Sequence, residues 1–350
     1  MSSSTSPIVV ATAALPGAVL VGWLLVIGQS LIVPILLGVI SVYMIASGAQ
    51  KLITVLPSPF SSPRIGVLLV LLLFLASILG LIILILENGQ GITEALPVYS
   101  DNLNALIAAQ ATRFGFEDAP TVASLTALLQ EALDFQALAQ MAFGTASSIA
   151  STVVMTILYA VFLAGDLKAM PEKLQRAFSS ERSAQDTTQL VLKINRRVGD
   201  YLLAKTLVNL ILAALSFAVM LLLGIEFAIL WAVLIGVLNY IPYIGSVVGV
   251  VFPVLICIAQ FGTLGPAVTA LVGLMGAQIV VGYVLEPKML GRSVNLSAFV
   301  VLIALSFWTA LWGTMGTILA VPLTAMIMIF LAEIPGARPV AVLMSEDGIL

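Results

Sequence analysis

Groups that could carry out chemistry are few in this sequence of 350 residues. Histidine is absent, and the one cysteine, Cys257, lies inside an apolar run. The most common general base and metal ligand are therefore missing, and a single thiol can form neither an intramolecular disulfide nor a cysteine metal site. The sequence also has no G-x-x-x-x-G-K-[ST] phosphate loop. We therefore expect no enzyme activity, no cofactor and no metal site, with Cys257 a buried apolar residue.

Two long apolar stretches are interrupted by polar residues, which could bind a solute although they could not catalyse a reaction. Residues 228–260 are broken near Asn239 to Ser246, and residues 298–332 near Trp312 to Gly316. Each half has roughly 11–16 residues and would reach about 17–24 Å as a helix, whereas the hydrocarbon core of a bilayer is about 30 Å thick. We expect each stretch to fold back as a re-entrant hairpin. The alternative is a single tilted and broken helix.

The residues at the two interruptions suit a site for a small polar solute or a cation. A broken helix frees backbone N–H and C=O groups, which in lipid must line a polar cavity or bind a ligand. Side-chain amides and hydroxyls add neutral hydrogen bonds, glycines allow close approach, and prolines interrupt the helical ladder. The alternatives are simple helix kinks and aromatic side chains at the membrane interface. The expected translocation residues here are Asn239, Tyr240, Pro242, Tyr243, Gly245, Ser246, Trp312, Gly313, Thr314, Gly316 and Pro322.

The elements that must position these residues are membrane helices. The chain is 61% apolar and 9% charged, whereas a soluble domain carries about 25% charged residues. No basic stripe faces an aromatic one, so nucleic acid is excluded as a partner and the lipid bilayer is expected. Apolar runs predict full spans at 8–28, 31–47, 65–86, 148–165, 202–223 and 266–285. The predicted fold is an all-α integral membrane protein with about six full transmembrane helices and two re-entrant helical hairpins.

Charge separates the two polar segments. Residues 87–147 hold seven acids and one base, whereas residues 166–200 hold seven bases. Segments rich in Lys and Arg stay in the cytoplasm, which places 166–200 and both termini inside and 87–147 outside. Apolar residues at helical spacing predict one or two amphipathic helices in 87–147, lying on the membrane or on a neighbouring subunit. The basic segment is expected to be a solvated helical pair that enforces topology, or else a patch for lipid headgroups.

The last part of the chain reads as an inverted repeat. The span 202–223 precedes the hairpin 228–260, and the span 266–285 precedes the hairpin 298–332 with the opposite direction. Such repeats with interrupted segments indicate a transport site, here with both tips near the midplane. In chain order the sequence predicts scaffold helices (1–86), an extracytoplasmic amphipathic segment (87–147), a transmembrane helix (148–165), a basic cytoplasmic segment (166–200), a transport core (201–335) and a cytoplasmic tail (336–350).

Charges close to the apolar spans are rare. Asp200 and Lys205 open one span, and Glu286 and Lys288 follow another. We expect these four at the level of the lipid headgroups; the alternative is that they pair or handle ions. Glu226 and Glu286 are the candidates for ion coupling.

Three strings in the second half of the chain resemble the autoinducer-2 exporter-like family of bacterial multi-pass membrane proteins. They are LGIEFAILWAVLIGVLNYIPYIGS at 223–246, YVLEPKMLGRSVNLSAF at 283–299 and WGTMGTILAVPL at 312–323. The resemblance implies an oligomeric, elevator-type carrier of the bacterial inner membrane, with a pentamer as the expected assembly. It adds Glu286, Pro287, Gly291 and Asn295 to the expected translocation residues. The chain departs from the family pattern at Ser297-Ala298, where a His-Pro pair is expected, and at Lys205, where a glutamine is common.

The function expected from both lines of reasoning is secondary transport of a small polar solute. The resemblance implies export of a quorum-sensing autoinducer-2 signal or a related solute. Two alternatives stay open at this point: a sodium(lithium)/proton antiporter, and a non-transporting membrane scaffold whose working part is the acidic segment 87–147.

Overall fold

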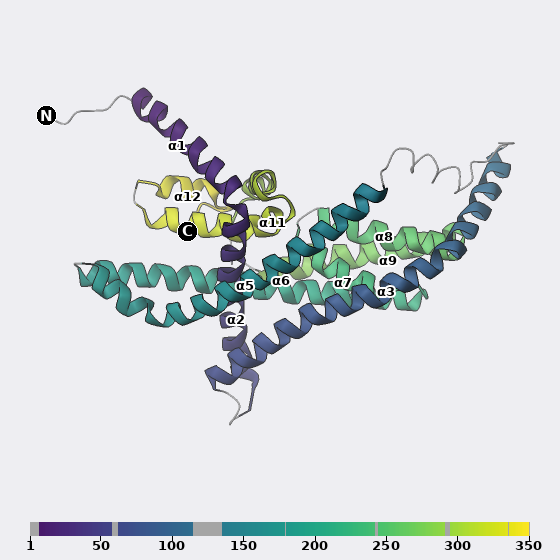
Figure 1. Cartoon of the computed structure of the whole chain (residues 1–350), viewed down its shortest axis with the longest axis horizontal. Helices are drawn as coiled ribbons and strands as arrows, with labels where there is room; N and C mark the ends of the chain where they lie inside the picture. Colours follow the sequence, from purple (N-terminus) through teal and green to yellow (C-terminus); the bar gives the residue numbers. More distant parts are fainter. Residues whose placement is uncertain are drawn as a thin grey trace. The chain divides into compact units, whose positions relative to one another are not determined.

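The computed structural model describes residues 7–57, 62–114, 135–178, 180–241, 244–290, 295–334 and 336–349. Within these ranges the chain is helical apart from short turns and one isolated bridge between Leu296 and Ser345. The helices are α1 (Pro7–Ile27), α2 (Gln29–Val55), α3 (Pro63–Phe114), α5 (Phe135–Ala177), α6 (Glu181–Leu222), α7 (Ala228–Leu238), α8 (Ile244–Phe261), α9 (Leu264–Ile279), the π-helix η1 (Val280–Leu285), α10 (Glu286–Leu290), α11 (Ala298–Glu333) and α12 (Arg338–Met344) (Figure 1). The all-α prediction is confirmed for these ranges.

Five helical segments among the described residues are long and apolar enough to cross a membrane. They are Gln29–Val55, Pro63–Gly89, Glu181–Leu222, Leu264–Leu290 and Ala298–Glu333. The bent pair Thr152–Asp166 and Ala169–Ala177 makes a sixth if it counts as one span. The prediction of several apolar membrane helices is thus confirmed, while the number of crossings stays a prediction.

Helices run across four of the predicted segment borders. Residues 63–114 form one continuous helix of 52 residues, although a span at 65–86 and a separate amphipathic helix after it were expected. The span expected at 148–165 lies within the 43 residues of α5, and α6 joins the end of the basic segment to the span 202–223. A change in hydropathy marks where a helix leaves an apolar environment, and it does not end the backbone hydrogen-bond ladder. The break expected at 115–120 lies outside the described residues.

The chain forms two compact units. Unit 1 contains Met1–Ser47, Ser147–Asp200 and Arg292–Leu350, and unit 2 contains Gly48–Ala146 and Tyr201–Gly291. The border at 200/201 coincides with the predicted start of the transport core. Of the predicted transport core 201–335, the first interrupted stretch belongs to unit 2 and the second to unit 1, and the role of 201–335 as one transport core stays a prediction.

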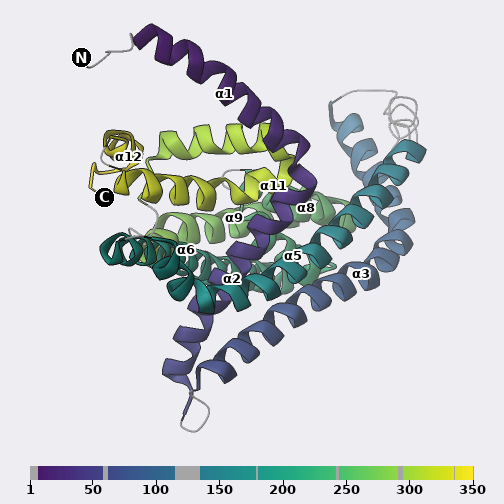
Figure 2. The same ribbon diagram turned by 60° about the vertical axis from the view of Figure 1, so that its left-hand side comes forward.

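The core of unit 2 is formed by residues of α6, α7, α8 and α9. Helix α8 packs against α7 and α9, and α3 contacts α7 and α8; Figure 2 shows α8 and α9 beside each other. Cys257 is fully buried there, as expected, together with small residues such as Ala232, Ala270 and Ala277. Because lipid removes most of the hydrophobic drive for helix association, small side chains that let backbones approach closely are the usual solution. The core of unit 2 combines such alanines with large buried side chains such as Leu212 and Met220, and long apolar side chains also occupy its exposed surface.

Unit 1 is held by close helix crossings of its own. Gly38 of α2 faces the backbone of α5, where an added Cβ would lie 3.2 Å from the nitrogen of Ala160. Gly199 of α6 faces α2, where a Cβ would lie 2.7 Å from the carbonyl oxygen of Tyr43. The C-terminal α12 packs on α11 in the same unit, and α1 also contacts α11. Glycine at these crossings lets the helices come closer than larger residues would allow.

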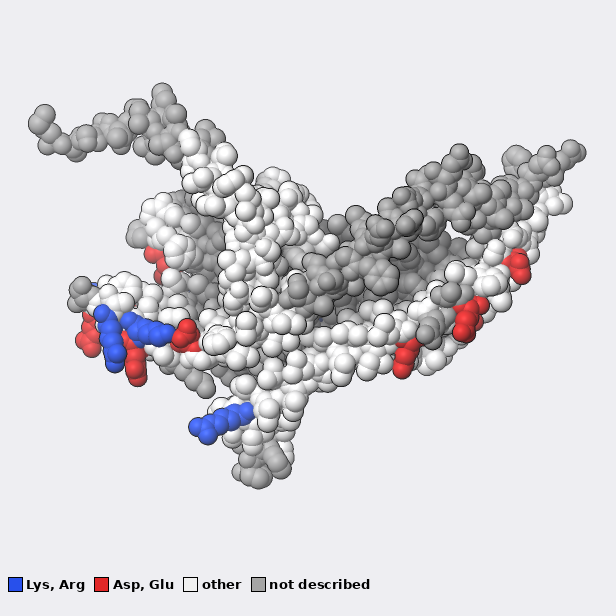
Figure 3. Space-filling model, in the orientation of Figure 1, with Lys and Arg blue, Asp and Glu red and all other residues white. Residues whose placement is uncertain are grey.

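Charged side chains gather on particular segments of the visible surface (Figure 3). The second half of α3 shows only acids there, and its Glu87, Glu94 and Asp101 are exposed. Bases and acids are mixed where α5 meets α6, and a base also lies close to the start of α3. This segregation agrees with the charge pattern in the sequence, while the orientation in the membrane stays a prediction.

Candidate functional site

The first interrupted stretch folds back on itself between α7 and α8. An ideal Cβ on Gly245 would lie only 1.8 Å from the carbonyl oxygen of Leu238, and Gly249 packs against Ile235. These contacts join residues on both arms of a turn that begins at Asn239. The stretch is therefore a hairpin of two short helices rather than one tilted helix. Pro242 and Tyr243 lie in this turn but outside the described residues.

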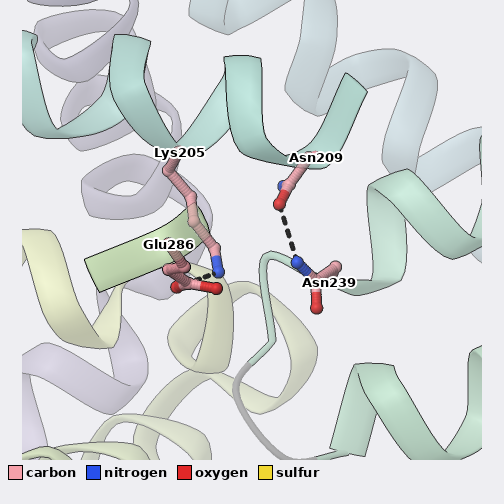
Figure 4. A network of polar contacts seen from close by, with 4 residues as sticks. All are labelled: Lys205, Asn209, Asn239 and Glu286. Carbon is pink, nitrogen blue, oxygen red and sulfur yellow. Dashed lines mark hydrogen bonds and ion pairs between the residues drawn. The ribbon is translucent and has the colours of Figure 1, made fainter. Parts of the chain in front are cut away.

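Asn239 at the tip of the first hairpin contacts a polar residue of α6. Its Nδ2 donates a hydrogen bond of 2.8 Å to Oδ1 of Asn209, and the side-chain oxygen of Asn239 points away from this contact (Figure 4). Asn209 and Asn239 are 3% and 7% exposed. The Nδ2 of Asn209 is buried and has no hydrogen-bond partner among the described residues. Such an orphaned donor is uncommon in a protein interior, because it forfeits the hydrogen bonds it made with water.

An ion pair lies one helical turn from this amide pair. Lys205 Nζ is 2.6 Å from Oε1 of Glu286, and the two side chains are 6% and 28% exposed. Lys205 and Asn209 are four residues apart on α6, so they point from the same face (Figure 4). Both Lys205 and Glu286 were expected at headgroup level. Lys205 and Glu286 do form a pair in the structure, while their depth relative to the lipid headgroups stays a prediction.

The π-helix before Glu286 has a local cause. Pro287 lacks the N–H of a normal helical bond, and its ring would collide with the carbonyl of residue 283 in a regular α-helix. Widening to η1 moves this carbonyl away, and the N–H of Glu286 bonds to the oxygen of Val281, five residues back. Such π-turns are frequent at functional sites. Here the wider turn immediately precedes the residue that pairs with Lys205.

Hydroxyl groups complete the set of polar side chains around the first tip. The oxygens of Thr206 and Tyr240 are 2.6 Å apart, again joining α6 to the hairpin. We use the name polar cluster for the six residues that make these three contacts. Its members are Lys205, Thr206, Asn209, Asn239, Tyr240 and Glu286. The cluster offers amide, hydroxyl, ammonium and carboxylate groups inside an otherwise apolar helix bundle.

The second interrupted stretch, within α11, also folds back. Trp312 (φ −132°, ψ 16°) and Gly313 (φ 57°, ψ −137°) are non-helical, and the latter geometry needs a glycine. The hydroxyls of Thr309 and Thr317 are 2.7 Å apart, although a straight helix would separate eight residues by about 12 Å. An added Cβ on Gly316 would lie 1.8 Å from the carbonyl oxygen of Trp308. This stretch is thus a second hairpin, in unit 1.

Other residues expected at the second tip have different surroundings. Trp312 is buried, and its indole N–H donates to the carbonyl oxygen of Leu25 in α1 at 2.9 Å. Gly313 and Thr314 are exposed at the turn. Pro322 was expected to stop the helix, yet α11 continues past it to Glu333, so the break depends on Trp312–Gly313 instead.

The remaining predicted residues divide between the units. Ser246 is half-buried on α8 in unit 2, and Pro287 follows Glu286 in α10. Asn295 lies in unit 1, where its Nδ2 donates to Oδ1 of Asp347 at 3.0 Å and so ties the start of the second hairpin to the C-terminal segment. Gly291 lies outside the described residues.

Glu226, the second ion-coupling candidate, does not join the polar cluster. It accepts a hydrogen bond from the Tyr99 hydroxyl of α3, and its N–H donates to Oε1 of Gln260 at 2.9 Å. It follows the far end of α6, and the 17 residues between Lys205 and Leu222 span about 26 Å. Burial, with Glu226 beside it, raises the pKa of Tyr99 above its usual range. Asn102 donates to the carbonyl oxygens of Ala259 and Gln260 nearby. These contacts clasp α3 onto the open end of the first hairpin.

Two residues of the polar cluster were not identified from the sequence. Thr206 and Asn209 lie within an apparently ordinary apolar span. The signal that could have found Asn209 is its spacing of four from Lys205, because polar residues at i and i+4 share one helix face. Among the described residues, no three of His, Cys, Asp and Glu lie together as a metal site would require.

Known proteins resemble most of this chain. The family model described as AI-2E family transporter matches residues 14–336. The AI-2 transport protein TqsA of Escherichia coli is 32% identical over 200 residues, or 57% of each chain. A putative transport protein of Borreliella burgdorferi is 32% identical over 201 residues, covering 57% of this chain and 55% of that protein. The chain thus matches a little over half the length of these relatives. With its several membrane-capable helices, the chain belongs to the AI-2E transporter family.

Proposed function

We propose that this protein is a secondary transporter that carries a small polar solute, with the polar cluster of unit 2 as its substrate site. The observation that carries the proposal is the buried Nδ2 group of Asn209, which has no partner among the described residues. Leaving such a donor unpaired costs about 1–3 kcal/mol. A substrate oxygen that accepts this hydrogen bond recovers the cost, so the site is complete only when it is loaded.

The chemistry of the cluster favours an uncharged, oxygen-rich substrate. Its charged members neutralise each other in the pair of Lys205 and Glu286. The groups left for recognition are amides and hydroxyls, which bind carbonyl and hydroxyl oxygens without excluding either hydrogen-bonding role. The relative from Escherichia coli is named for AI-2 transport. An autoinducer-2-like signal is therefore the first substrate to test, and export is the direction that the family resemblance favours.

In this proposal the two hairpins are re-entrant and work by elevator-type alternating access. Each arm of the first hairpin is short, with 11 residues in α7 and 18 in α8. The α7 arm would reach about 17 Å, less than the hydrocarbon core. Four further parts of this scheme remain predictions. They are the role of 201–335 as a transport core, the location of 87–147 outside and 166–200 inside, the meeting of the two tips, and a pentameric assembly.

A sodium(lithium)/proton antiporter is the second candidate function. The observation that favours it is Glu286, a partly buried carboxylate of the kind that marks ion paths in membrane proteins. Its pairing with Lys205 argues against a free cation at that carboxylate. Membership in a transporter family argues against the third idea, a scaffold that transports nothing.

Flux into proteoliposomes tests the proposed function. We expect vesicles that contain the purified protein to take up autoinducer-2 at least about tenfold faster than protein-free vesicles. Uptake of D-ribose is measured in the same way as a second uncharged solute. Asn209→Leu keeps the side-chain size and removes the amide, so flux should fall about tenfold or more, since one hydrogen bond to a buried group contributes roughly 1–3 kcal/mol. The matched control is Thr269→Val, which removes an exposed hydroxyl in the same unit.

Three outcomes decide the matter. Flux that depends on Asn209 and not on Thr269 supports the proposal. Proton flux that starts only when Na⁺ or Li⁺ is added supports the antiporter instead. Failure of the full-length protein to accelerate either solute or proton movement would contradict both.

A further inference from the structure

The Lys205–Glu286 pair is unusual among the ion pairs of this chain. Its side chains are 6% and 28% exposed, whereas those of Lys193 and Glu333 are 41% and 45% exposed at the same distance of 2.6 Å. Exposed pairs tolerate loss of either partner because water replaces it. In the buried pair, the carboxylate of Glu286 depends on the ammonium of Lys205 for its neutralisation.

Stability alone is a weak reason for such a pair. Taking two charges out of water costs about as much as their attraction returns, and apolar residues of similar volume often stabilise a protein equally well. Among the described residues, the titratable groups that interact with Glu286 are Lys205 and Tyr201, both from α6. Among these groups, Lys205 alone carries a positive charge. A partly exposed carboxylate with neighbouring hydroxyls otherwise has the oxygen donors that a hard cation prefers.

We propose that the Lys205 ammonium is a built-in cation for Glu286, standing where a free Na⁺ or Li⁺ ion would otherwise bind. This inference rests on the proposed function and refines it: the substrate cycle runs without a coupling cation. A tethered ammonium in contact with the carboxylate competes with dissolved ions at a high effective concentration. It also repels them, so the wild-type site does not admit Na⁺ or Li⁺.

The arrangement of the chain suits this role. Lys205 and Glu286 belong to the same compact unit, as do Asn209 and Asn239. Movement of unit 2 as a body leaves the ion pair intact. The charge of the polar cluster therefore stays constant through such a cycle, and the substrate is the only solute that enters or leaves the cluster.

Thermal unfolding of the purified full-length protein tests the inference without any transport assay. The protein is melted at pH 8 in NaCl, LiCl and choline chloride of equal ionic strength. We expect the Tm of the wild type to be the same in all three salts. Lys205→Ala frees both the charge and the space of the side chain, so its Tm should rise by about 3 °C or more in Na⁺ or Li⁺ at tenfold the dissociation constant.

Two further variants make the result specific. Lys205→Arg keeps a tethered cation and should show no difference between salts. Lys205→Ala with Glu286→Gln removes the carboxylate as well and should lose the response of the single variant. If Lys205→Ala cannot be purified in choline, recovery of folded protein in Na⁺ or Li⁺ buffer gives the same information.

The inference is overturned by either of two results. A wild-type Tm that rises in Na⁺ or Li⁺, with the rise abolished by Glu286→Gln, means that the site takes a free cation despite Lys205. A Lys205→Ala Tm that is lowered equally in all three salts means that the pair is purely structural. Neither result bears on solute flux through proteoliposomes, so failure here is distinct from failure of the proposed function.

Discussion

The first hairpin brings a buried amide, Asn239, against polar groups of α6, whereas the second presents Gly313 and Thr314 at an exposed tip. Polar contacts of the second hairpin join its own two arms, as between Thr309 and Thr317 and between Trp308 and Thr324. Its rings of Trp308 and Trp312 also pack together, with centroids 4.9 Å apart. The polar tip of the first hairpin thus contacts a neighbouring helix, while the second hairpin has polar contacts between its own arms in addition to its bond to α1.

Both hairpins nevertheless have a glycine where their two arms cross, and both are hydrogen-bonded to a helix that precedes them in the chain. Gly245 and Gly316 each sit where an added Cβ would lie 1.8 Å from a carbonyl oxygen of the opposite arm. Each hairpin is also bonded to an earlier helix, the first through Tyr99 of α3 and the second through the carbonyl of Leu25 in α1. The shared features thus explain how the hairpins form. The polar contacts, which differ, favour the first hairpin as the one that binds the substrate. That division of roles can be broken experimentally.

Substituting the crossing glycines has the largest expected effect. Alanine at position 245 or 316 would force apart two arms whose contact leaves no room for a methyl group. Overpacking typically costs about 1–3 kcal/mol, and a clash with backbone cannot relax by side-chain movement. We expect Gly245→Ala and Gly316→Ala each to lose roughly 3 kcal/mol or more, measured as the yield of monodisperse protein and its Tm.

Open glycines supply the controls for this prediction. Gly276 in unit 2 and Gly165 in unit 1 have nothing within 4 Å of an added Cβ. Alanine there should be neutral or stabilise the helix by up to about 1 kcal/mol. A Gly245→Ala protein as stable as Gly276→Ala would show that the arms of the first hairpin do not cross as described.

Removing one polar contact from each hairpin separates recognition from stability. Asn239→Leu keeps the volume at the first tip but deletes the amide that contacts Asn209. We expect solute flux to fall about tenfold or more, since about 1.4 kcal/mol corresponds to a factor of ten. Thr309→Val deletes the contact with Thr317 in the second hairpin and should lower stability by about 1 kcal/mol with flux little changed. Flux in proteoliposomes and Tm are measured for both variants.

The proposed division of roles is contradicted if Thr309→Val lowers solute flux as Asn239→Leu is expected to do. A flux loss for Thr309→Val as large as that for Asn239→Leu, at equal Tm, would give the second hairpin a share in recognition. Ser306→Ala is a suitable control in the second hairpin, because its exposed hydroxyl bonds only within its own helix, to Leu302.

Much of the fold was predictable because a membrane limits the available structures. Apolar runs with no partner for their backbone must be helices, and membrane-capable helices occur at the predicted spans 31–47, 65–86, 202–223 and 266–285. Interruption by glycine, proline and polar residues predicted that 228–260 and 298–332 turn back, and both stretches do form hairpins. Whether each hairpin re-enters the membrane, and from which side, depends on the bilayer as well as on the chain, so both points stay predictions.

The site was less predictable, because its partners come from distant parts of the chain. Local sequence identified Asn239, Tyr240 and Glu286, but each contacts a residue of α6 at least 30 positions away. Asn209 lies in an apolar span, and its spacing of four from Lys205 places both residues on one helix face without showing which residue of the hairpin Asn209 contacts. Continuity of α3 was missed for a different reason, because composition changes near residue 87 and Gly89, Gly91 and Pro97 follow, yet the helix continues through them.

The ties to the earlier helices give the smallest and most specific prediction. Tyr99→Phe removes the hydrogen bond to Glu226 and should cost about 1 kcal/mol at neutral pH. Burial raises the pKa of Tyr99 in the folded protein, so its contribution is constant below the ordinary tyrosine pKa of about 10 and is lost as pH rises above it. The Tm advantage of the wild type over Tyr99→Phe should therefore shrink between pH 9 and pH 11 (roughly one unit either side of that value).

The corresponding change in the second hairpin is Trp312→Phe, which removes the indole bond to Leu25. Because an indole does not titrate in this range, its cost should be the same at every pH. Equal and pH-independent losses for both variants would mean that folding does not shift the pKa of the Tyr99 hydroxyl. The clasp on the first hairpin would then be a neutral contact like that on the second, and the two ties would differ only in position.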